Sequence, residues 1–254
     1  EGSKRDIIAA TRGNHGQSVA FAAREFGRKA TIVVPHGNNP DKNRAMRAFG
    51  AKLIEFGNDF DAAFDHARTL SQEKNLEFLP SFHPSLVQGV GTYAYEFLSA
   101  IRDLDVVYIP IGLGSGIAGF LAAREALGHS VEVIGVVSEM ADAYASSWEA
   151  GKIVTTDTAN TIADGLAVRI PSVEALDYIS RRVARIIRVS EANIVLAAKV
   201  LLSDTHNLAE PAGAASLAGL IEEQSRMIGK RVGIVLTGSN IDEETLLKMI
   251  SSKE

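Results

Sequence analysis

The chain has 254 residues, of which 46% are hydrophobic and 22% charged, as in a globular protein with one large domain or two smaller ones. A net charge of −5 without any basic block argues against nucleic acid as a partner, and the lack of cysteine excludes disulfides and thiolate metal sites. No apolar run is long enough to span a membrane and no signal peptide opens the chain, so we expect no membrane contact and a cytoplasmic location.

Short β-branched runs alternate with helical patterns in the first third of the chain. Asn39, Pro40 and Gly50 supply a cap, a first-turn proline and a stop for one of these helices. Strands are predicted over 7–10, 30–35, 51–56 and 76–82, and helices from 18 onward, over 38–50, over 59–74 and over 84–101.

The same alternation resumes in the remainder of the chain and predicts an α/β fold with parallel sheets covered by helices. The stretch "PSFHPS" marks a shift in composition, which divides the chain into a smaller α/β domain over 1–83 and a larger one over 84–254. Strands are predicted over 106–111, 131–137, 185–189 and 232–236, and helices over 117–127, from 191 onward and over 210–227.

Three polar, glycine-bearing turns follow predicted strands, at Thr11–His15, Gly112–Gly119 and Leu236–Asn240. Ligands of parallel α/β folds bind at the carboxyl ends of strands, which is where these turns lie. The first turn, "TRGNH", offers N–H groups at the start of a helix that can hold an anion. It would serve equally well as a capped connection, and the stretch by itself leaves both interpretations open.

The second turn, "GLGSGIAG", favours phosphate binding, because its glycines and serine expose N–H groups at the positive end of a helix dipole. A competing interpretation is available for the same residues. Gly114, Gly116 and Gly119 spell G-x-G-x-x-G, and Glu139 ends the following strand where a ribose-binding acid is expected. That pattern predicts a nicotinamide-dependent oxidoreductase, although it leaves the other two turns unexplained.

Five motifs together resemble those of the threonine/serine dehydratase family of fold-type II pyridoxal-phosphate enzymes. They occur in the family's order over essentially the whole chain: "RGNHGQ", "PIGLGSGIAG", "TIADGLAV", "AEPAGAASLAG" and "LTGSN". The resemblance implies a two-domain fold with parallel sheets flanked by helices, and a cleft between the domains that holds pyridoxal 5′-phosphate.

The resemblance also implies how the cofactor is held. Asn14 would hydrogen-bond its 3′-oxygen, and Thr237 would meet its pyridine nitrogen. Main-chain donors would cradle the phosphate, at Gly112, Leu113, Gly114, Ser115 and Gly116.

The first turn would hold the substrate, a small amino acid. The backbone N–H groups implied for its carboxylate are those of Thr11, Gly13, Asn14 and His15. Arg12 departs from the family, which usually has a small residue there, and its fixed positive charge makes racemase chemistry unexpected. Arg12 either pairs with an acid group of the substrate or lies on the surface.

The implied activity is that of an ammonia-lyase that converts L-threonine, L-serine or a related β-hydroxy amino acid to a 2-keto acid and ammonia. The family's Schiff-base lysine lies about two dozen residues before the asparagine of the first turn, whereas only Lys4 precedes Asn14 here. We expect Lys4 to be a surface charge, and the Schiff-base lysine to lie upstream of Glu1 in an N-terminal segment that the chain lacks. A non-catalytic protein that binds pyridoxal phosphate is the alternative.

Two further expectations concern metals and assembly. Some family members bind a divalent ion near the strand that ends here at Val137, but Val136 stands where an acidic ligand would be needed, so no metal site is predicted. A homodimer is expected, since dimers are the commonest assembly.

Overall fold

The computed structural model describes residues 5–251, so Lys4 lies outside the described residues. The chain divides into two compact units, unit 1 over Glu1–Ser81 and unit 2 over Phe82–Glu254. Within the described range, no helix is both long and apolar enough to cross a bilayer.

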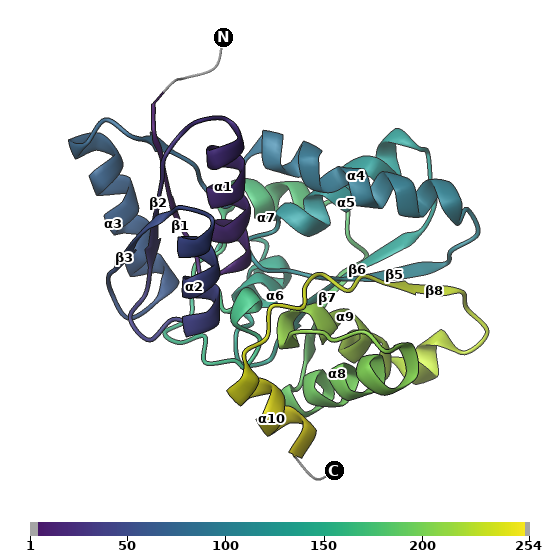
Figure 1. Cartoon of the computed structure of the whole chain (residues 1–254). Coiled ribbons are helices and arrows are strands. Elements are labelled where there is room, and N and C mark those ends of the chain that lie inside the picture. Colours follow the sequence, from purple (N-terminus) through teal and green to yellow (C-terminus); the bar gives the residue numbers. More distant parts are fainter. Residues whose placement is uncertain (1–4, 252–254) are drawn as a thin grey trace. The chain divides into compact units, whose positions relative to one another are not determined.

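Unit 1 is built on a four-stranded sheet in the order β3-β2-β1-β4, with every pair parallel. In Figure 1, α1 and α2 lie on one side of this sheet and α3 on the other. The strands are β1 (Ile7–Ala10), β2 (Ala30–Val34), β3 (Lys52–Glu55) and β4 (Glu77–Phe78), and the helices are α1 (Asn14–Glu25), α2 (Pro40–Ala48) and α3 (Phe60–Glu73).

Side-chain caps explain where the helices of unit 1 begin. Asn39 accepts hydrogen bonds from the N–H groups of Asp41 and Lys42, and Asp59 accepts one from Ala62, so each satisfies donors that a helix start leaves free. The predicted starts of α2 and α3 are therefore confirmed.

Unit 2 contains a second four-stranded parallel sheet, in the order β7-β6-β5-β8. Its strands are β5 (Val106–Pro110), β6 (Glu132–Ser138), β7 (Arg185–Val189) and β8 (Val232–Ile234). Its α-helices are α4 (Pro84–Ala100), α5 (Ser115–Ala126), α6 (Ala143–Ala150), α7 (Val173–Ser180), α8 (Glu191–Thr205), α9 (Pro211–Glu222) and α10 (Glu243–Ser251), with 3₁₀ turns at Asp164–Leu166 and Gln224–Met227.

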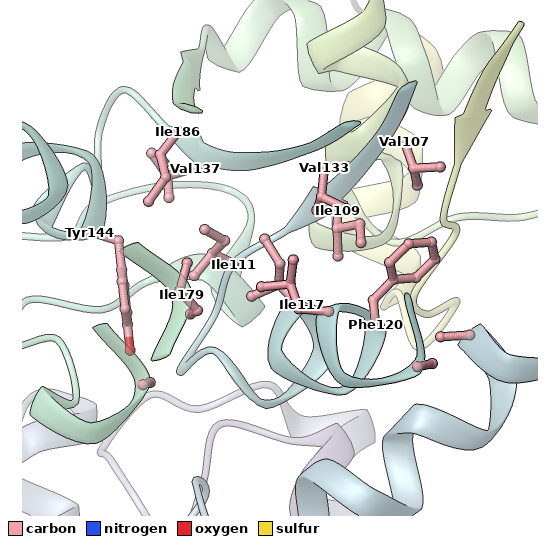
Figure 2. Close-up of a cluster of buried hydrophobic side chains, with 14 of the residues drawn as sticks. Val107, Ile109, Ile111, Ile117, Phe120, Val133, Val137, Tyr144, Ile179 and Ile186 are labelled. Carbon is pink, nitrogen blue, oxygen red and sulfur yellow. The ribbon is translucent and has the colours of Figure 1, made fainter. Parts of the chain in front are cut away.

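Alternate residues of β5 supply two separate cores on the two faces of the second sheet. Val107 and Ile109 pack with Phe120 of α5 on the face covered by α4 and α5 (Figure 2). Val106 and Tyr108 point to the opposite face, which α8 and α9 cover. A strand buried on both faces is typical of parallel sheets, and the predicted α/β class with helix-covered parallel sheets is confirmed.

Several elements differ from the sequence-based expectations. Helices α6, α7 and α10 were not predicted, although Ser172 caps α7 by accepting a hydrogen bond from the N–H of Ala175. The last strand was predicted over 232–236 but ends at Ile234. Beyond that point the carbonyl of Val235 accepts a hydrogen bond from the hydroxyl of Ser216 on α9, which draws the chain toward α9.

Candidate functional site

The turn between β5 and α5 presents the start of a helix without a competing side chain. Gly114 is the N-cap of α5 in the left-handed conformation, with φ of 94°, which glycine adopts at little cost. Among the described residues no side chain caps this helix, and its first turn contains no acid. The first N–H groups of α5 and its dipole therefore favour an anion at this position.

The glycines of this turn differ in how much space a side chain would have. A Cβ at Gly112 would lie 2.5 Å from the carbonyl oxygen of Gly165, and one at Gly114 would lie 2.9 Å from the Cβ of Ala175. A Cβ at Gly116 would meet no described atom within 4 Å. The turn is thus tightly packed on one side and open at Gly116, and a cradle of main-chain donors of this kind fits a phosphate group.

Further close approaches between backbones bring the other motifs of unit 2 to the same place. A Cβ at Gly165 would lie 2.9 Å from the Cβ of Ala212. A Cβ at Gly213 would collide with the carbonyl oxygen of Gly238, and that oxygen also accepts a hydrogen bond from the N–H of Glu210, at 3.1 Å. The second and third predicted turns, together with the segments "IADG" and "AEPAG", therefore form one packed cluster.

Thr237 lies in this cluster, directly before Gly238. Its side chain is exposed, so its hydroxyl is accessible to a ligand. This exposure is compatible with the cofactor contact expected from the sequence, which stays a prediction.

The first predicted turn connects β1 to α1 within unit 1. The N–H of Thr11 donates to the carbonyl of Val33 at 3.1 Å, and the N–H of Gly13 donates to the hydroxyl of Thr11 at 2.9 Å. Two of the donors expected to hold the substrate therefore already have partners inside the protein. Asn14 and His15 occupy the first turn of α1, where N–H groups have no acceptor within the helix.

Two side chains of this turn have unusual surroundings. Burial lowers the pKa of His15 to about 4, and its Nε2 atom is enclosed and has no hydrogen-bond partner in the described part of the chain. Arg12 is half-buried, and within residues 5–251 it forms neither a hydrogen bond nor an ion pair. The imidazole is therefore neutral near pH 7, while the guanidinium carries an uncompensated charge.

Sequence reasoning missed two residues that hold the cluster in unit 2 together. The carboxylate of Glu191 accepts hydrogen bonds from the hydroxyls of Ser138 and Thr161, both at 2.6 Å, and from the N–H of Ile162, at 2.7 Å. The hydroxyl of Tyr144 donates to the carbonyl of Leu113 at 3.0 Å. Glu191 was identifiable from sequence only as an acid at a helix start, and nothing local distinguished Tyr144.

The G-x-G-x-x-G pattern has a packing explanation at its third glycine. A Cβ at Gly119 would lie 2.8 Å from the nitrogen of Gly91 and 2.9 Å from the carbonyl oxygen of Val87, so Gly119 allows α4 and α5 to approach closely. Glu139 is exposed after β6. In the described part of the chain, no group of three or more His, Cys, Asp or Glu side chains is arranged to hold a metal ion.

Residues 1–238 match the model of the family described as pyridoxal-phosphate dependent enzymes. The chain belongs to this family. The predicted cofactor and the resemblance to the threonine/serine dehydratase group are thereby confirmed, and the relatives described next agree with both. The nicotinamide interpretation gains no support from these similarities.

Among curated relatives, the chain is 34% identical over 252 residues to the L-threonine ammonia-lyase of Thermotoga maritima, which covers 99% of this chain and 63% of that protein. It is 30% identical over 255 residues to the L-threo-3-hydroxyaspartate ammonia-lyase of Saccharomyces cerevisiae, covering 100% of this chain and 78% of that protein. The chain thus spans less than two thirds of the length of the threonine ammonia-lyase.

Solved structures give the same result for the fold. The processed form of threonine deaminase isoform 2 from Solanum lycopersicum superposes with a TM-score of 0.89 at 29% identity, covering 96% of this chain and 72% of that one. The fold-type II architecture is therefore confirmed.

Proposed function

We propose that this chain belongs to an ammonia-lyase that uses pyridoxal 5′-phosphate to convert L-threonine, L-serine or a related β-hydroxy amino acid to a 2-keto acid and ammonia. The observation that carries the proposal is the phosphate-compatible cradle at Gly112–Gly116, packed together with the "IADG", "AEPAG" and "LTGSN" segments. The names of the relatives, threonine and hydroxyaspartate ammonia-lyases, support the same reaction class.

The cofactor supplies an electron sink for the charge that develops at Cα when the substrate loses its proton. The chain's own contribution is to hold and orient. Main-chain donors at the start of α5, including Ser115 and Gly116, would bind the phosphate through the helix dipole. Thr237 would meet the pyridine nitrogen with a hydroxyl, which does not hold a proton there as a carboxylate does. Asn14 would hydrogen-bond the 3′-oxygen, an assignment that rests on the motif.

The substrate carboxylate would be bound at the start of α1. Because the N–H groups of Thr11 and Gly13 already have acceptors, the N–H of His15 in the first turn of α1 supports this role most directly. Arg12 adds a half-buried charge to the same turn. It would pair either with the same carboxylate or with a second acid group on the substrate, such as that of a β-hydroxy dicarboxylic amino acid.

The experiment that tests the activity is borohydride trapping of the natively expressed protein, followed by mass mapping of any pyridoxyl-lysine. An adduct on a lysine that precedes Glu1 supports the lyase. Absence of any adduct, with the N-terminus established at Glu1, overturns the covalent mechanism and favours a non-catalytic pyridoxal-phosphate protein or a nicotinamide enzyme.

A homodimer and a cytoplasmic location complete the proposal. Size-exclusion chromatography with light scattering tests the first, and localisation of a tagged full-length protein tests the second. A monomer, or a protein found outside the cytoplasm, would contradict the corresponding part.

A further inference from the structure

The hydroxyl of Tyr144 joins two segments that surround the phosphate cradle. It donates to the carbonyl oxygen of Leu113 at 3.0 Å and accepts from the N–H of Ser172 at 3.1 Å. The side chain is almost completely buried, with 1% of its surface exposed. We propose that Tyr144 is a positioning residue that orients the N–H groups of the cradle toward the cofactor phosphate. This inference rests on the proposed function.

The planarity of the peptide group explains how a carbonyl bond sets the direction of a donor. In a trans peptide, the carbonyl of one residue and the N–H of the next point in opposite directions. Because the hydroxyl of Tyr144 holds the carbonyl of Leu113, the N–H of Gly114 points away from Tyr144. Gly114 is the N-cap of α5, so this donor stands at the helix start where an anion is favoured.

The second hydrogen bond of Tyr144 holds α7, the helix that packs against the cradle. The N–H of Ser172, the N-cap of α7, donates to the hydroxyl of Tyr144. A Cβ at Gly114 would lie 2.9 Å from the Cβ of Ala175 and 3.0 Å from the Cδ1 of Ile179, both on that helix. One hydroxyl therefore couples the turn to the helix against which the turn packs.

The ring of Tyr144 is itself held in place. Figure 2 shows it in the same cluster as Ile111 and Ile179, with its oxygen at the end of the ring farther from Val137 and Ile186. Burial raises the pKa of Tyr144 above its usual value, so the hydroxyl keeps its proton and remains a donor at neutral pH.

The ion pairs of Arg188 on β7 anchor the helix that carries Tyr144. The guanidinium bonds Asp142, the N-cap of α6, at 2.8 Å, and Glu149 near the end of that helix at 2.6 Å. A helix fixed near both ends places the tyrosine hydroxyl with little freedom, as a positioning role requires.

The test is the substitution Tyr144→Phe in the full-length protein, with the apoprotein titrated with pyridoxal 5′-phosphate. We expect the dissociation constant to rise about tenfold, because removing the hydroxyl breaks two buried hydrogen bonds and the Leu113 carbonyl no longer holds the N–H of Gly114 toward the phosphate. The ³¹P resonance of the bound cofactor should also shift, which a purely structural role would not produce.

Two tyrosines of the same unit provide matched controls. Tyr108→Phe removes a buried hydroxyl that donates to Glu223 on the opposite face of the sheet, so it should lower the melting temperature and leave cofactor affinity unchanged. Tyr93→Phe removes a hydroxyl that has no hydrogen-bond partner among the described residues, and should change neither.

The outcomes distinguish a failure of the proposed function from a failure of the role assigned to Tyr144. A wild-type protein that binds no pyridoxal phosphate overturns the proposed function. A wild-type protein that binds it, with a Tyr144→Phe variant of unchanged affinity and ³¹P resonance, overturns the role of Tyr144 alone. Should Tyr144→Phe not fold, 4-aminophenylalanine at the same position keeps a weaker donor. Its affinity should then fall about two- to threefold, and an unchanged value would overturn the inference.

Discussion

The backbones of Gly112 and Gly165 approach so closely that a methyl group on Gly112 would lie 2.5 Å from the carbonyl oxygen of Gly165. This contact joins the β5–α5 turn to the "IADG" segment. It makes the space on that side of Gly112 unavailable to any side chain, and it explains why the turn is glycine there without reference to a ligand.

Gly112→Ala should therefore destabilise the protein by about 1–3 kcal/mol, because backbone atoms must shift to relieve the overlap. Thermal unfolding of the apoprotein measures the effect. Gly116→Ala is the matched control, since a Cβ there meets no described atom within 4 Å, and alanine is the better helix former. Equal melting temperatures for the two variants would contradict the packing argument.

His15 should make stability depend on pH between about 6.5 and 4. Burial lowers its pKa to about 4 in the folded chain, so between these values the unfolded chain binds a proton that the folded chain does not. The contribution of His15 to the free energy of unfolding is complete above pH 6.5. It falls by about 3 kcal/mol as the pH drops to 4 and changes little below that.

Chemical unfolding of wild type and His15→Gln at pH 7, 5.5 and 4 tests this dependence. The variant should lose less stability over the interval. An imidazole that titrates near 6.5 in an NMR experiment on the folded protein would show that the ring is not buried as described.

Glu223 should add a second, more acidic dependence. Burial would raise the pKa of this carboxyl, but its hydrogen bonds with Arg185, at 2.6 Å and 3.0 Å, and with Tyr108 outweigh burial and lower it below the usual 4.5. A lowered folded pKa means that its stabilisation is present above the unfolded pKa and is lost as pH falls through the folded one.

Glu223→Gln should flatten the decrease in melting temperature below about pH 4.5, and Glu244→Gln, on the exposed surface beside Lys248, should not. If the melting temperatures of wild type and Glu223→Gln decrease equally steeply below about pH 4.5, the ion pair with Arg185 does not account for the acid sensitivity.

Arg12 should affect the choice of substrate. Its guanidinium has no partner within residues 5–251, whereas the first turn of α1, with the N–H of His15, is the place proposed for the α-carboxylate. We expect Arg12→Gln to lower kcat/KM roughly tenfold for L-threo-3-hydroxyaspartate and to leave L-threonine almost unchanged. Equal losses for both substrates would place Arg12 on the α-carboxylate, and no loss for either would place it on the surface.

Features encoded by neighbouring residues were predictable from the sequence. The starts of the helices at Asn39 and Asp59 were recognisable because a cap bonds N–H groups only two or three residues ahead. The alternation of strand and helix patterns, which is also read from neighbouring residues, predicted the parallel sheets. The motif "GLGSGIAG" showed a phosphate-compatible turn because its chemistry resides in its own backbone.

The tertiary structure alone decided which distant residues meet. Tyr144 contacts Leu113 across 31 positions, and Glu191 contacts Ser138 across 53, because the strand order β7-β6-β5-β8 brings their elements together. Gly119 completes a dinucleotide-like pattern in the sequence, yet in the fold it lets α4 pack on α5. Local geometry is fixed by backbone sterics and short-range hydrogen bonds, whereas these pairings depend on how whole strands order themselves in a sheet.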